Sequence, residues 1–250
     1  MNFPFTIEVD SVKLPVHLIF EVLGFFIGFK YYSYLRKKSG DVISSSNRIW
    51  ILIGAIFGSF IGSRLVGGLE NPANIAGANN ILLYFYSNKT VLGGFVGGLF
   101  GVEIVKKIIG EKNASGDLFT YPIILGLIIG RLGCFSMGVY ENTYGIETTF
   151  FTGMDLGDGV LRHPVTLYEI GFLILLWFFI KLIDKRIKLA NGSQFKIFFI
   201  TYFVFRFFCD FLKPGTRVII GLSTIQLTCL IGLLWYIRYI LKPSKFTDSN

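Results

Sequence analysis

The chain has 250 residues, of which 52% are hydrophobic and 16% are charged, whereas a soluble domain carries about 25% charged residues. Its mean hydropathy is +0.61, and the apolar residues fall in blocks of about 18–22 residues, the length of a helix that crosses a bilayer. This composition excludes an ordinary soluble domain. It predicts an all-α, polytopic membrane protein that forms a single integral membrane domain.

The net charge of +8 does not indicate nucleic-acid binding, because the basic residues gather in short loops between apolar blocks, where membrane proteins place cytoplasmic charge. The three cysteines, Cys134, Cys209 and Cys229, lie inside apolar blocks and form no CxxC or metal-ligand spacing. We therefore expect them to pack as small apolar residues, with no metal site and no nucleic-acid partner.

The apolar blocks predict seven spans, at residues 15–35, 49–69, 91–109, 121–139, 165–183, 195–212 and 219–241. Of the 24 Lys and Arg residues, sixteen lie in or beside the loops on one side, five lie on the other, and three lie within spans. The positive-inside rule then places the N-terminus outside and the C-terminus in the cytoplasm. Glu8 and Asp10 stand where a signal peptide carries basic residues, so we expect the first span to persist.

Glycines recur four residues apart in the second and third spans, a spacing that lets transmembrane helices pack closely. Close packing is the ordinary interpretation of this pattern. The alternative is that Gly93 and Gly94 allow a lipid head group to approach the backbone of the third span.

Ionisable residues inside spans are costly and therefore mark candidate functional sites. Arg131 lies in the middle of an apolar block and needs an anionic partner or a water-filled cavity. Arg206 and Asp210 are four residues apart, so we expect Asp210 to share a helix face with Arg206 and to orient it. Buried arginines donate bidentately to phosphate oxygens, which points to a phospholipid substrate.

Three motifs then resemble the prolipoprotein diacylglyceryl transferase family: GLIIGRLGCFSMGVYENTYG (126–145), RHPVTLYE (162–169) and YFVFRFFCDFLKPG (202–215). The segments at 56–69 and 91–103 resemble the second and third spans of that family. The resemblance implies a seven-span enzyme of the bacterial inner membrane. It implies transfer of diacylglycerol from phosphatidylglycerol to the lipobox cysteine thiol of a preprolipoprotein, with release of glycerol phosphate and no metal or diffusible cofactor.

The resemblance also assigns residues. Arg131 and Arg206 would hold the lipid phosphate, and Glu169 and Asp210 would orient them. The remaining motif positions that the resemblance carries over to substrate binding are Gly145 and Tyr202.

The chain departs from the family pattern at several positions. Cys134 replaces the signature asparagine, and we expect it to pack rather than to act as a nucleophile. The family's catalytic histidine falls at Leu92 or Val96, neither of which can take a proton. The first-span tyrosine is not obvious, since His17 stands near that position. If a general base is needed, His163 is the motif-embedded imidazole that is left, although its motif also suits a structural role at the start of the fifth span. The alternative is that a thiol near two guanidinium groups ionises without a dedicated base.

Two interpretations of the chain's function stay open. The chain is either a divergent transferase, with a lipoprotein cysteine or another acceptor, or a non-catalytic phospholipid-binding or lipid-moving paralogue. An unrelated transporter is disfavoured because the sequence lacks an obvious inverted repeat.

Overall fold

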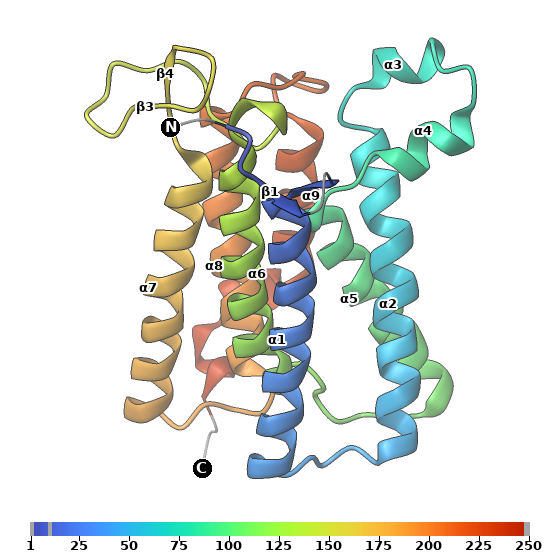
Figure 1. Ribbon diagram of the computed structural model, residues 1–250. Helices are drawn as coiled ribbons and strands as arrows, with labels where there is room; N and C mark the ends of the chain where they lie inside the picture. Colours follow the sequence, from blue (N-terminus) through green and yellow to red (C-terminus); the bar gives the residue numbers. More distant parts are fainter. Residues whose placement is uncertain (1–2, 10–11, 248–250) are drawn as a thin grey trace.

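A computed structural model describes residues 3–9 and 12–247, so Asp10 lies outside the described residues. Long helices run side by side as a bundle (Figure 1). Their bounds are α1 Val16–Ser39, α2 Ser45–Gly68, α5 Val91–Ile109, α6 Asp117–Met137, α7 Val165–Arg186, α8 Ser193–Cys209 and α9 Thr224–Trp235.

Short elements connect the helices of the bundle. The short helices are α3 Pro72–Ala76, α4 Ile81–Ser87, α10 Ile237–Ile240 and the 3-10 turns η1 Gly138–Tyr140, η2 Asp210–Leu212 and η3 Pro243–Phe246. Two antiparallel hairpins pair β1 Thr6–Val9 with β2 Val12–Pro15 and β3 Met154–Asp155 with β4 Leu161–Arg162. The strands β1, β3 and β4 lie with α3 and α4 at one end of the bundle, while the α1–α2 loop lies at the opposite end (Figure 1).

Among the described residues, four helices are long and apolar enough to cross a membrane: α1, α2, α6 with η1, and α7. Helices α5, α8 and α9 also fall at predicted spans, but α8 has 17 residues and α9 has 12. At 1.5 Å per residue, α9 is about 18 Å long, which is less than the thickness of a bilayer core. The four long apolar helices nevertheless confirm the predicted all-α membrane fold.

The last predicted span begins later than expected, at Thr224 rather than at residue 219. The Ser223 side chain accepts from the backbone of Gln226, and the Gln226 side chain accepts from the Ser223 N–H, which forms a capping box. The residues before it form a turn in which Ile219 pairs with Leu222. Hydropathy alone could not separate this apolar turn from the helix.

Helices α2 and α5 pack with their backbones in contact, as the glycine spacing predicts. A Cβ atom added at Gly97 would overlap the carbonyl oxygen of Gly58, and one added at Gly93 would overlap that of Gly62. At Gly94 an added Cβ would lie 3.7 Å from Ser59 and Ser63 of α2, which is ordinary contact. Since Gly93 and Gly94 both face α2, the structure favours helix packing over approach of a lipid head group.

This packing predicts different outcomes for two alanine substitutions on one helix. Gly97→Ala should lower the free energy of unfolding by about 1–3 kcal/mol, because the methyl group forces α2 and α5 apart. Gly94→Ala, the matched control, should leave it unchanged or raise it slightly, because alanine favours helix and the site has room. Thermal unfolding of both variants in detergent measures the difference. Equal melting temperatures would contradict the backbone contact.

The core of the bundle is aromatic and centres on α8. Its fully buried side chains include Phe198, Phe199 and Phe203, which contact α5, α7 and α9 residues. Edge-to-face contacts join Phe95 of α5 to Phe198 and Phe199, with ring centroids 6.1 and 5.1 Å apart. This packing fixes the rotation of α8 and so aims its polar residues toward α6 and α7.

Candidate functional site

Three polar side chains meet inside the bundle around one carboxylate. Glu169 of α7 is only 1% exposed. Its Oε1 lies 2.9 Å from Nε of Arg131 and accepts a 2.6 Å hydrogen bond from the Tyr202 hydroxyl. Its Oε2 accepts a 2.8 Å hydrogen bond from Nη1 of Arg206. We call Arg131, Glu169, Tyr202 and Arg206 the arginine–carboxylate cluster.

Helix geometry brings this cluster together from three segments that are distant in sequence. Pro164 precedes the first residue of α7, which sets Glu169 in the second turn of that helix. Tyr202 and Arg206 are one turn apart on α8 and therefore face the same way. Helix α6 packs against α7 and α8, and this packing places Arg131 opposite both residues. The acid that Arg131 requires is thus supplied by α7.

The cluster retains positive charge and unused hydrogen-bond donors. Two guanidinium groups share one carboxylate, which leaves a formal charge of +1. Although Nε of Arg131 lies within ion-pair distance of Glu169, the Nε–H groups of Arg131 and Arg206 are buried and meet no acceptor with hydrogen-bond geometry among the described residues. Buried donors of this kind are costly unless they are satisfied. A phosphate oxygen has the charge and the acceptor capacity to satisfy them.

A third cation stands beside the cluster, just beyond α8. Burial, together with the charges of Arg206 and Arg131, lowers the pKa of Lys213, while Asp210 and Glu70 oppose this shift. Burial also raises the pKa of Glu70. The surroundings of the two arginines are therefore crowded with like charge, which an anionic ligand would relieve.

Asp210 does not orient Arg206, so that expectation is wrong. Its carboxylate accepts from the Ser223 hydroxyl and lies 3.3 Å from Nη1 of Arg217, and no hydrogen bond or ion pair joins it to Arg206 in the described part of the chain. The reason is local: α8 ends at Cys209, and Asp210 opens the turn η2. Asp210 therefore stabilises the α8–α9 loop, and Arg206 pairs with Glu169 instead of Asp210.

His163 lies in the loop segment that covers this end of the bundle. Its Nδ1 is 3.1 Å from the Tyr168 hydroxyl, which also bonds to Thr152. Gly145 is buried against the His163 backbone, where a Cβ would overlap its carbonyl oxygen. Within residues 3–9 and 12–247, no hydrogen bond or ion pair links His163 to Arg131 or Arg206. The contacts of His163 and Gly145 are those of a packed loop.

The two positions at which the resemblance places a catalytic histidine are apolar in their surroundings as well as in their identity. Leu92 is 1% exposed, and Val96 packs against the same hydrophobic core. Neither position could carry proton transfer.

The structure also brings together residues that sequence reasoning missed as a group. Cys134 lies beside His17 and Glu141, and its Sγ is 3.7 Å from Nη1 of Arg131. His17 precedes the other two by more than one hundred residues, so no local motif indicates their contact. The sequence signal that could have revealed this group was the pair of departures from the family pattern at His17 and Cys134.

Comparison with known proteins agrees with this architecture. A family described as prolipoprotein diacylglyceryl transferase matches residues 4–241. Proteins named phosphatidylglycerol–prolipoprotein diacylglyceryl transferase are similar to the chain along most of their length. The one from Campylobacter lari is 28% identical, with 94% of this chain and 93% of the relative covered. The one from Wolbachia sp. subsp. Brugia malayi is 30% identical, with 99% and 98% covered. Since the family match spans nearly the whole chain, the protein belongs to the prolipoprotein diacylglyceryl transferase family.

Proposed function

We propose that this protein is a transferase that moves the diacylglyceryl group of phosphatidylglycerol to the lipobox cysteine thiol of a prolipoprotein. The thiol sulfur attacks the diacylglyceryl carbon that carries the phosphate. A C–S bond forms, the C–O bond to the phosphate breaks, glycerol phosphate leaves with the bonding electrons, and the thiol proton is released to solvent.

The observation that carries this proposal is the arginine–carboxylate cluster. Its formal charge of +1 and the buried Nε–H of Arg206, which has no hydrogen-bond or ion-pair partner among the described residues, suit a phosphodiester, which brings one negative charge and several acceptor oxygens. Arg131 and Arg206 would bind the phosphate of the lipid and stabilise the charge that grows on it as the C–O bond breaks. Glu169 and Tyr202 would hold both arginines in place. We assign His163 to the loop rather than to the chemical step.

A direct assay tests the activity. Purified protein is incubated with phosphatidylglycerol labelled in its acyl chains and with a lipobox peptide, and the peptide is analysed for the added diacylglyceryl group. Transfer of label to the cysteine supports the proposal. Release of glycerol phosphate without peptide modification would indicate another acceptor, and binding of phosphatidylglycerol without release would identify a non-catalytic lipid-binding paralogue.

We further propose seven spans in the bacterial inner membrane, with the N-terminus outside and the C-terminus in the cytoplasm. The 16-to-5 distribution of Lys and Arg between the two sides supports this orientation. The arginine–carboxylate cluster would then lie toward the outer face, under the loop at residues 140–164.

Reporter fusions test the orientation. Alkaline phosphatase fused within residues 145–160 should be active, because the enzyme folds only outside the cytoplasm, and the same reporter fused after Lys242 should be inactive. The reverse pattern would contradict the proposed topology.

A further inference from the structure

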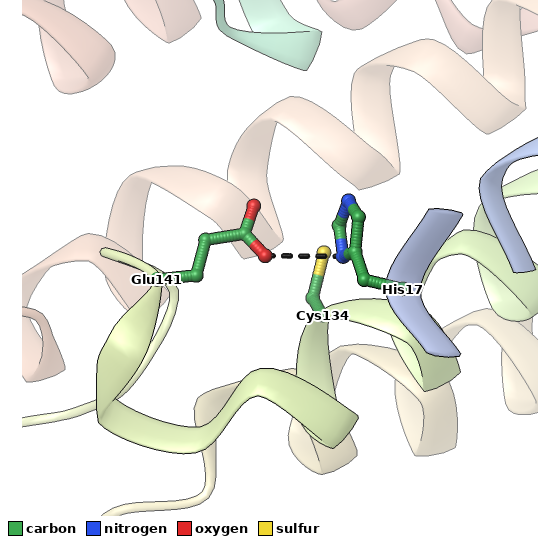
Figure 2. A group of neighbouring side chains, drawn as sticks. All are labelled: His17, Cys134 and Glu141. Carbon is green, nitrogen blue, oxygen red and sulfur yellow. Dashed lines mark ion pairs between the residues drawn. The ribbon is translucent and has the colours of Figure 1, made fainter. Parts of the chain in front are cut away.

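Three side chains with metal-ligating atoms converge where α1 meets the end of α6 (Figure 2). His17 comes from the first turn of α1, Cys134 from the last turns of α6, and Glu141 directly follows η1. Their ligand atoms all lie within 4.8 Å of one another, and His17 Nδ1 is 3.1 Å from Glu141 Oε2. Nδ1 is buried and makes no hydrogen bond of good geometry with the described residues, although it points into the group.

Although the spacing of the cysteines predicted no metal site, we propose that His17, Cys134 and Glu141 form a zinc site. Imidazole nitrogen, thiolate sulfur and carboxylate oxygen are the ligand set that zinc prefers. With zinc–ligand bonds of 2.0–2.3 Å, ligand atoms around a tetrahedral ion lie about 3.3–3.8 Å apart. The observed spacing needs only small side-chain shifts to reach that geometry. Three protein ligands leave a fourth position open, as in catalytic rather than structural zinc sites.

Residues around the group match the outer shell that zinc ligands usually have. Nε2 of His17 faces a carboxylate oxygen of Glu21 at 3.6 Å, and Glu21 is held by Lys89 at 3.0 Å. A carboxylate on the far nitrogen fixes the ring and the tautomer of a ligating histidine. On the sulfur side, Nη1 of Arg131 lies 3.7 Å from Cys134. Hydrogen bonds to a bound thiolate serve the same purpose.

The charges of the site balance when a divalent ion is bound. The thiolate of Cys134 and the carboxylate of Glu141 supply two negative charges, and neutral His17 supplies none. A divalent cation cancels them. The neighbouring Arg131 shares Glu169 with Arg206, so the arginine–carboxylate cluster keeps a formal charge of +1, which a bound lipid phosphate would neutralise.

The position of the site suggests its role, which rests on the proposed transferase function. Cys134 lies one helical turn from Arg131, so a zinc ion held by Cys134 would lie next to the position proposed for the lipid phosphate. An acceptor thiol that binds zinc loses its proton to solvent and becomes the thiolate nucleophile. This chain has no histidine at Leu92 or Val96 to remove that proton, and zinc would supply the missing activation.

Metal content tests the site independently of activity. The full-length protein is purified in detergent, dialysed against zinc, washed and analysed for metal by mass spectrometry. We expect one zinc per chain in the unchanged protein and a loss of at least tenfold in Cys134→Ala and His17→Ala. The matched controls Cys209→Ala and Cys229→Ala remove the other cysteines and should keep one zinc. Cobalt in place of zinc should give a sulfur-to-metal charge-transfer band that disappears in Cys134→Ala.

The outcomes separate the site from its role and from the transferase function. Less than about one zinc per ten chains in the unchanged protein, or full zinc in Cys134→Ala, overturns the site. Full zinc with diacylglyceryl transfer that survives chelation of the metal overturns the role. Phosphatidylglycerol binding is measured in the same samples. Phosphatidylglycerol binding should persist in Cys134→Ala. If the unchanged protein does not bind phosphatidylglycerol, the result counts against the transferase proposal instead.

Discussion

Replacement of Glu169 by glutamine is expected to lower the free energy of unfolding by about 3–5 kcal/mol, because it leaves Arg131 and Arg206 buried without a counter-charge. The carboxylate is 1% exposed, so water cannot screen the two guanidinium groups once it is neutral. The amide oxygen of glutamine would still accept the hydrogen bond from Tyr202, and the glutamine side chain would fill the same volume as glutamate. The loss therefore reports charge rather than packing. Thermal or denaturant unfolding in detergent gives the measurement.

Two further variants separate this explanation from general fragility of the bundle. Glu103→Gln removes an exposed acid that pairs with Lys106 at 3.3 Å, and it should change stability by less than about 0.5 kcal/mol. Glu169→Gln combined with Arg206→Gln restores the formal charge of the cluster to +1, so it should regain part of the lost stability. If the double variant were less stable than Glu169→Gln alone, charge would not be the cause.

Replacement of either arginine by lysine is expected to reduce diacylglyceryl transfer roughly 10- to 150-fold, or about 1.5–3 kcal/mol. Lysine keeps the positive charge but cannot reproduce the planar fork that donates to Glu169 and to a phosphate oxygen together. The rate of transfer to a lipobox peptide is measured for Arg131→Lys and Arg206→Lys at equal concentrations of folded protein. Arg238→Lys, in the short helix α10, provides the control and should transfer at the original rate. Unchanged rates in the two cluster variants would remove the arginines from the chemistry.

Much of the fold follows from local sequence patterns. Apolar blocks and flanking charges located the helices, and the third predicted span agrees with α5 at both ends. The exception is the last span, where a short apolar turn before Ser223 has the same hydropathy as a helix. Only the hydrogen bonds of the capping box separate the two, and hydropathy does not measure them.

The candidate site was predictable in its members but not in all of its pairings. Arg131 and Arg206 were identifiable because ionisable residues inside apolar blocks are costly, and Glu169 was identified through the family resemblance. The partner of Arg206 was not, because the spacing to Asp210 assumes that α8 continues, whereas it ends at Cys209. Contacts between distant helices, such as that between His17 and Cys134, depend on tertiary packing, and no sequence spacing encodes them.

The central claim is that Arg131 and Arg206 bind one lipid phosphate, and the most direct measurement compares two lipids that differ in that group. The affinities for phosphatidylglycerol and for diacylglycerol with the same acyl chains are determined for the unchanged protein, Arg131→Lys and Arg206→Lys. We expect each substitution to weaken phosphatidylglycerol binding by roughly 10- to 150-fold and to leave diacylglycerol binding unchanged. An equal loss for both lipids, or no loss for either, would contradict the account.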